Sequence, residues 1–215
     1  MKVVIVTVPM KDPKDVDAII HPVEGNKAIE YGKPVRCPIN GVLAKTLKKD
    51  EQVKFIYIMS TCKSASKNSN SEQNKKDFIE EIEGINTEIG AVLSYDTVEI
   101  EFSATNHAYE KLITDLTDKI PEKAEIYTDF TFGSKPEALS LFCALRFVEE
   151  FCDAVVQFIV YGKVEFTKGE GGKVIKENPM LYDSTSLYYL FKLMGTIRNA
   201  DKETASKLLK DFFAL

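Results

Sequence analysis

The segment with the clearest potential for chemistry is the turn at residues 131–135, TFGSK, which joins an apolar run to a long amphipathic one. Backbone amides and hydroxyl groups at the start of a helix bind phosphate well, and Gly133 would let the backbone approach a ligand closely. Pro136 suits the first helical turn, where no amide donor is needed. The pattern predicts either an ordinary helix cap with a solvated Lys135 or a phosphate-binding turn.

Apolar runs alternate with amphipathic runs along the whole chain. We expect strands at 2–8, 53–61, 97–105, 124–131 and 154–166, and helices at 39–49, 75–90, 108–120, 135–151, 185–200 and 202–215. This alternation predicts an α/β fold, a Rossmann-like doubly wound, mainly parallel sheet flanked by helices, with further helices at the C-terminus.

Ligands of doubly wound sheets lie outside the carboxyl ends of the strands. The residues that follow the predicted strands are mostly small, hydroxylated or rich in donors. Lys63, Ser103 and His107 are among them. The candidate ligand-binding residues are Thr7, Pro9, Met10, Asn40, Ser60, Thr61, Thr105, Asn106, Thr131, Phe132, Gly133, Ser134 and Lys135.

Three polar segments separate the predicted elements. Residues 9–38 are rich in proline and glycine and predict an extended loop, which is either functional or a solvated excursion. Residues 63–75 are rich in Ser and Asn and predict a mobile loop or a lead-in to the next helix, and residues 168–178 predict a Gly/Lys hairpin or loop. Asn40 is a candidate cap for the helix at 39–49.

Composition and motifs exclude several classes of protein. The net charge of −5 disfavours long nucleic acid but not a small anionic ligand. We find no GxGxxG after the first strand, no GxxxxGK[ST] and no GxSxG, so a dinucleotide site, a P-loop and an α/β-hydrolase are disfavoured, and we expect no cofactor. The cysteines, which we expect to be reduced, form no metal-type cluster with the histidines; these residues are Cys37, Cys62, Cys143, Cys152, His21 and His107.

No stretch of the sequence has the length and apolarity of a membrane span, and no signal peptide is evident at the N-terminus. We therefore expect a cytoplasmic protein of one domain.

The segment DFTFGSKPEALSLFCALRF resembles the motif that follows the fourth strand in the CRISPR-associated Rossmann fold (CARF), the sensor domain of type III CRISPR systems. The positions that carry the likeness are Asp129, Phe130, Thr131, Gly133, Lys135 and Pro136. RCPINGVLAKTL is similar to the first helix of the family, and PMLYDSTSLYYLFKLMGTI to a late helix in one of its branches. Phe132 stands where the family usually has a small or polar residue.

The resemblance implies a homodimer that binds cyclic oligoadenylate, a ring of four or six AMP units (cA4 or cA6), across a two-fold interface. Thr7, Pro9 and Met10 would face the ring from one side and residues 131–135 from the other, with Lys135 balancing phosphate charge. Asn40 or Asn106 would contact adenine. Further positive charge would come from the basic residues of the long loop, Lys11, Lys14, Lys33 and Arg36.

Some members of the family also cut the ring without a metal, by attack of a ribose 2′-hydroxyl on the adjacent phosphate. For a ring nuclease the resemblance implies Lys135 as the cation that stabilises the transition state, with Thr131, Ser134 or Thr7 as positioning groups. His107 is a distant candidate acid. The alternatives from other classes are an unrelated Rossmann-like nucleotide enzyme and a protein-interaction domain.

Sensors of this family usually carry an effector domain. We expect a single CARF-like domain over 1–215, with a core at about 1–165 and a C-terminal hairpin and helices at about 166–215. The chain is then either a stand-alone protein or a sensor domain whose C-terminal effector is missing.

Overall fold

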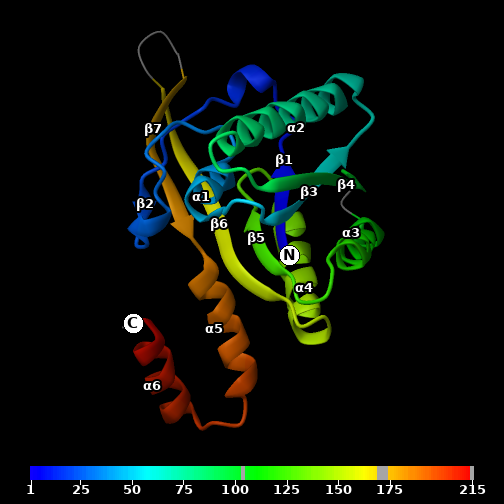
Figure 1. Ribbon diagram of the computed structural model, residues 1–215. Coiled ribbons are helices and arrows are strands. Elements are labelled where there is room, and N and C mark those ends of the chain that lie inside the picture. Colours follow the sequence, from blue (N-terminus) through cyan, green and yellow to red (C-terminus); the bar gives the residue numbers. More distant parts are fainter. Residues whose placement is uncertain (103–104, 169–173, 214–215) are drawn as a thin grey trace.

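The strands of the protein form one sheet in the order β2-β7-β6-β5-β1-β3-β4 (Figure 1). The computed structural model describes residues 1–102, 105–168 and 174–213, and of residues 106, 166, 168 and 174–176 it describes the backbone. The strands are β1 (Lys2–Val8), β2 (Val23–Glu24), β3 (Gln52–Thr61), β4 (Val92–Glu101), β5 (Glu125–Asp129), β6 (Val155–Lys168) and β7 (Val174–Asp183). Neighbouring strands are parallel except β6 and β7, which are antiparallel.

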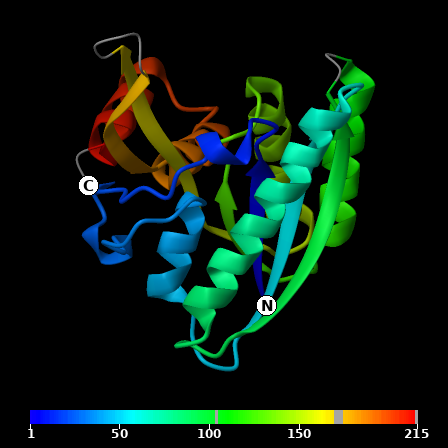
Figure 2. The same cartoon turned by 90° about the horizontal axis from the view of Figure 1, so that it is seen from above.

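Helices cover both faces of this sheet (Figures 1 and 2). They are α1 (Pro38–Thr46), α2 (Ala65–Asn86), α3 (Asn106–Lys119), α4 (Lys135–Phe151), α5 (Thr185–Thr196) and α6 (Lys202–Phe213). The pair α1 and α2 packs on one face and the pair α3 and α4 on the other, while α5 and α6 follow β7 beyond the sheet. The predicted α/β, doubly wound, mainly parallel sheet with C-terminal helices is confirmed.

The two faces of β1 show why its sequence is a continuous apolar run. Val4 and Val6 belong to the buried cluster beneath α1 and α2, whereas Val3 and Ile5 belong to the cluster beneath α3 and α4. A parallel strand that is covered on both sides has no solvent face, so its central residues are apolar and its polar residues, Lys2 and Thr7, stand near its two ends.

The segment at 63–75 differs most from its predicted structure, because α2 already begins at Ala65. Ser71 and Asn74 are fully buried within this helix. Their side chains donate to backbone carbonyls of the segment that follows β1, so the polar composition marks a contact face and not a mobile loop. The expected cap at Asn40 is also wrong, since Asn40 lies inside α1 and the N-cap residue is Cys37.

The segment between β1 and α1 contains short regular elements instead of being extended throughout. These are the 3-10 helices η1 (Pro13–Asp15) and η2 (Lys27–Ile29), the edge strand β2 and an antiparallel bridge between Ile19 and Val35. The hairpin expected at 168–178 corresponds to the antiparallel pair β6 and β7, and its residues 169–173 lie outside the described part of the chain. Among the helices described, none combines the length and apolarity that crossing a membrane requires.

Candidate functional site

The order of strands reverses next to β1, because β3 and β4 lie on one side of it and β5 and β6 on the other. The carboxyl ends of β1 and β5 therefore flank the switch point at which doubly wound folds bind ligands. Thr7 and Gly133 meet there: a Cβ atom on Gly133 would lie 3.0 Å from Thr7 Cγ2. The Thr7 hydroxyl donates to the carbonyl of Asp129 at 3.3 Å. The two predicted strand ends are thus in contact, and the contact leaves little room for a side chain at 133.

Asp129, the last residue of β5, joins this strand to the start of α1. Its carboxylate is buried and accepts hydrogen bonds from the backbone amides of Ile39 and Thr131, both at 2.9 Å. Burial raises the pKa of Asp129, and the hydrogen bonds from Thr131 and Ile39 oppose that rise. No cation contacts this carboxylate among the described residues, so hydrogen bonds from two backbone amides and the Thr131 side chain compensate its burial. Asp129 therefore has a structural role at the site.

The turn at 131–135 includes Ser134, which forms a capping box with Glu137 at the start of α4. The Ser134 amide donates to Glu137 Oε2 at 2.5 Å, and Ser134 Oγ accepts from the Glu137 amide at 3.3 Å. The hydroxyl of Ser60, at the end of β3, donates to the other carboxylate oxygen of Glu137. A buried carboxylate thus lies at the positive end of the helix, where a phosphate would otherwise bind.

Lys135 differs from the other residues of this turn because its side chain is exposed. It makes no hydrogen bond or ion pair with the residues that the structure describes. Lys135 is therefore the group of the predicted turn that is available to an anionic ligand, while Ser134 serves mainly as the cap of α4.

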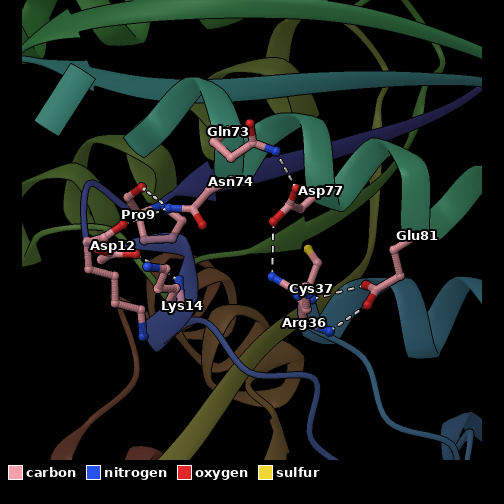
Figure 3. Close-up of polar contacts among 10 residues, drawn as sticks. Pro9, Asp12, Lys14, Arg36, Cys37, Gln73, Asn74, Asp77 and Glu81 are labelled. Atoms are coloured by element: carbon pink, nitrogen blue, oxygen red, sulfur yellow. Dashed lines mark hydrogen bonds and ion pairs between the residues drawn. The ribbon is translucent and has the colours of Figure 1, made fainter. Parts of the chain in front are cut away.

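A polar face of α2 fixes the segment that follows β1 (Figure 3). The Asn74 amide nitrogen donates to the carbonyls of Pro9 and Lys11, both at 2.9 Å, and the Asp77 carboxylate accepts from Arg36 Nη1 at 3.0 Å. Asn70 and Ser71 add bonds to the carbonyls of Met10 and Pro9. Because residues at intervals of three and four share one helix face, a single helix holds both ends of this long segment.

Glu81, one turn beyond Asp77, caps the start of α1. It accepts from the backbone amides of Arg36 at 2.6 Å and Cys37 at 3.2 Å, and from the Asn40 side chain at 2.9 Å (Figure 3). Burial raises the pKa of Glu81 despite these bonds. Glu81 and Asp129 together fill the N-terminus of α1, so this helix also presents few free amides to a ligand.

A pocket of about 180 Å³ opens beside the turn, between the end of β5, the middle of β6 and the segment after β1. Gly162 lines this pocket and is closely surrounded. Its amide donates to Thr131 Oγ1 at 2.8 Å, and a Cβ atom at this position would lie 2.7 Å from Pro38 Cγ. The Lys11 ammonium lies 5.2 Å from the centre of the Phe132 ring. The lining residues are Lys11, Asp15, Val16, Asp17, Ile19, His21, Arg36, Pro38, Thr131, Phe132, Tyr161, Gly162 and Val164.

Several predicted residues lie away from this pocket. Asn40 is buried and faces α2, and Thr61 donates to the carbonyl of Ile100. Thr105 is the N-cap residue of α3, which follows the edge strand β4, so β1 and β3 separate it from β5. His107 is exposed on α3. Ser103 and the side chain of Asn106 lie outside the described residues.

Of the residues at the site that the sequence analysis did not identify, one has a local sequence signal and the others have none. Glu137 carries a recognisable signal, since Ser134 followed three residues later by a Glu is the capping-box pattern. His21, Tyr161 and Gly162 carry none, because their meeting depends on how residues 9–37 fold back over the sheet.

No group of three or more His, Cys, Asp or Glu side chains is arranged to hold a metal within the described ranges of the chain. The four cysteines are free thiols. No protein-family model and no curated protein matches this sequence.

Proposed function

We propose that this chain binds a cyclic oligoadenylate at the carboxyl edge of its sheet, as the cytoplasmic sensor domain of a type III CRISPR ancillary effector. One observation carries the proposal. The residues that resemble the CARF motif form the turn at the end of β5, beside the switch point of the sheet, with Lys135 exposed and a pocket alongside. In doubly wound sheets this is the place where nucleotides bind.

The charged groups at this edge of the sheet indicate which residues would contact the phosphates of the ligand. The N-termini of α1 and α4 are filled by carboxylates of the chain, so side-chain cations must neutralise the phosphates. Lys135 supplies an exposed ammonium, and Lys11, which already interacts with the protein through the Phe132 ring, lines the pocket. Arg36 is held by Asp77 and contributes less net charge.

The exposed face of α4 supports the homodimer that a symmetric ring requires. Lys135, Leu139, Cys143, Phe147 and Phe151 follow one another at intervals of four residues, and all of them are exposed. Such rows form the ridges that interdigitate when two helices pack against each other. A two-fold contact along this row includes Lys135 of both copies, and a contact centred near the N-terminus of α4 would bring these two side chains close together.

The dimer has its own test, which is the molar mass in solution measured by light scattering. We expect a dimer for the natural sequence and a monomer for Phe147→Glu, which places a charge at the fourth position of the row. Phe191→Glu, at an exposed phenylalanine on α5, is the matched control and should remain dimeric. A monomeric natural protein in the presence of ligand would overturn the α4 interface.

The function is tested by incubating the purified protein with cA4 and with cA6, following thermal unfolding and separating the products by chromatography. At a ligand concentration of 100 Kd, binding stabilises the fold by about 2.7 kcal/mol, which raises the Tm of a chain of this size by roughly 5–10 °C. Lys135→Met should reduce this shift. Lys49→Met, at an exposed lysine before β3 at the opposite edge of the sheet, should leave it unchanged.

The products distinguish the classes of function. A shift with an intact ring means a sensor, and a search for its effector follows. Linear products that disappear in Lys135→Met mean a metal-independent ring nuclease. The absence of a shift with either ring would overturn the proposal in favour of an unrelated nucleotide enzyme or a protein-interaction domain.

A further inference from the structure

The pocket beside the 131–135 turn has the chemistry of a nucleobase site. Its volume of about 180 Å³ lies below the ~300 Å³ at which pockets begin to hold whole drug-sized ligands. It therefore has room for one flat heterocycle and not for a whole oligonucleotide ring. Most of its wall is apolar. Val164 of β6 contributes to it, together with Val16 and Ile19 of the segment after β1.

Two aromatic side chains of this wall are held in place by other rings. Phe132 stacks on Phe78 at a centroid distance of 5.8 Å, and Tyr161 stacks on Phe130 at 5.8 Å. Rings that are fixed in this way are platforms for bases, because stacking on a rigid aromatic face costs little conformational entropy. Phe132 is the position at which this chain departs from the small or polar residue of the CARF motif.

His21 gives the same wall a nitrogen atom without a hydrogen-bond partner. Its Nδ1 atom is buried and makes no hydrogen bond with the described residues. Burial lowers the pKa of His21, with a smaller opposing effect from the backbone of Ile19, so the imidazole is neutral at pH 7. A neutral imidazole nitrogen either donates or accepts one hydrogen bond, so Nδ1 of His21 can pair with one polar group on the edge of a purine.

We propose that this pocket takes up a purine base, which stacks against Phe132 or Tyr161 and forms a hydrogen bond with His21. This inference rests on the proposed function where it takes the base to be an adenine of the bound ring. It assigns the recognition of adenine to His21 in place of Asn40. The phosphates then extend from the pocket toward Lys11 and Lys135.

The chain has two histidines, which makes the test direct. AMP is titrated into the intact protein while the imidazole signals are followed by NMR, with ribose 5-phosphate as the probe that lacks a base. We expect AMP to shift the His21 signals and to leave those of His107, exposed on α3, in place. Ribose 5-phosphate should bind at least tenfold more weakly than AMP.

Variants add a second measurement. His21→Phe keeps a ring but removes the hydrogen bond, and it should weaken AMP binding about tenfold, the equivalent of one hydrogen bond. His107→Phe is the matched control and should bind as the natural protein does. The NMR titration of the natural protein decides the matter even if His21→Phe does not fold.

The outcomes separate this inference from the proposed function. If AMP shifts the His21 signals but neither cyclic ring binds, the base pocket is supported and the sensor function is refuted. If a cyclic ring binds while the His21 signals stay in place and His21→Phe retains full affinity, the sensor function stands and the base pocket is overturned. If AMP binds no more tightly than ribose 5-phosphate, the pocket does not recognise a base.

Discussion

The replacement Glu137→Ala tests the conclusion that the chain's own carboxylate occupies the N-terminus of α4. Glu137 is buried and accepts hydrogen bonds from the Ser134 amide and from the Ser60 hydroxyl. A hydrogen bond to a charged group contributes about 1.5–3 kcal/mol, and the loss of its acceptor leaves the buried Ser60 hydroxyl unpaired. We therefore expect Glu137→Ala to lower the free energy of unfolding by about 3 kcal/mol.

Urea unfolding followed by circular dichroism measures this loss, and two further variants identify its cause. Ser134→Ala removes the cap hydroxyl and should cost about 1 kcal/mol. Glu137→Gln keeps the shape of the side chain and one acceptor, so it should cost about 1 kcal/mol by losing the charge at the helix terminus. In the double variant Glu137→Ala with Ser60→Ala the losses should be less than additive, because both residues share one hydrogen bond. A cost below about 1 kcal/mol for Glu137→Ala would refute the assignment.

Three further predictions concern the elements around the pocket. Gly162→Ala should cost about 1–3 kcal/mol in thermal unfolding, because its Cβ would collide with Pro38, whereas Gly84→Ala in α2 meets open space and should be neutral or stabilising. Asn74→Leu removes the Asn74 hydrogen bonds to the carbonyls of Pro9 and Lys11 and should speed amide hydrogen exchange in the segment after β1, while the strands remain protected. The raised pKa of Glu81 means that the folded state holds its proton more tightly than the unfolded state. The natural protein should therefore gain stability relative to Glu81→Gln as the pH falls from 7 toward 4.5, measured by urea unfolding at each pH.

The central strands of the sheet were predictable because they are covered on both faces, whereas the edge strand β4 begins at Val92 and not at residue 97 as predicted. The apolar run that became β1 leaves no alternative to a buried parallel strand, and the same reasoning located β3 and β5. The start of α2 was not predictable in this way. Ser71 and Asn74 have the composition of a loop, and their burial follows from a tertiary contact with the carbonyls of Pro9 and Lys11. A polar residue whose partner is distant in sequence gives no local signal of burial.

The candidate site was predictable in its position but not in its chemistry. The rule that ligands lie at the carboxyl ends of strands correctly brought Thr7 and Gly133 together at the switch point. The same rule could not show that carboxylates would fill the adjacent helix termini, since Asp129 and Glu81 reach α1 from other elements. It also gave no indication of the pocket, whose lining includes His21 from a segment without regular alternation.

The filled helix termini change how an anion can be recognised at this edge of the sheet. A phosphate that binds to free backbone amides is held by fixed dipoles, which salt screens little when they are buried. Here Glu137 already accepts from the amide at the start of α4, so the attraction must come from the exposed ammonium groups of Lys135 and Lys11. Exposed charges are weakened by salt, and single ones contribute little. A dimer that brings two Lys135 side chains to one ligand would double this charge, whereas the affinity of a monomer would depend mainly on stacking in the pocket.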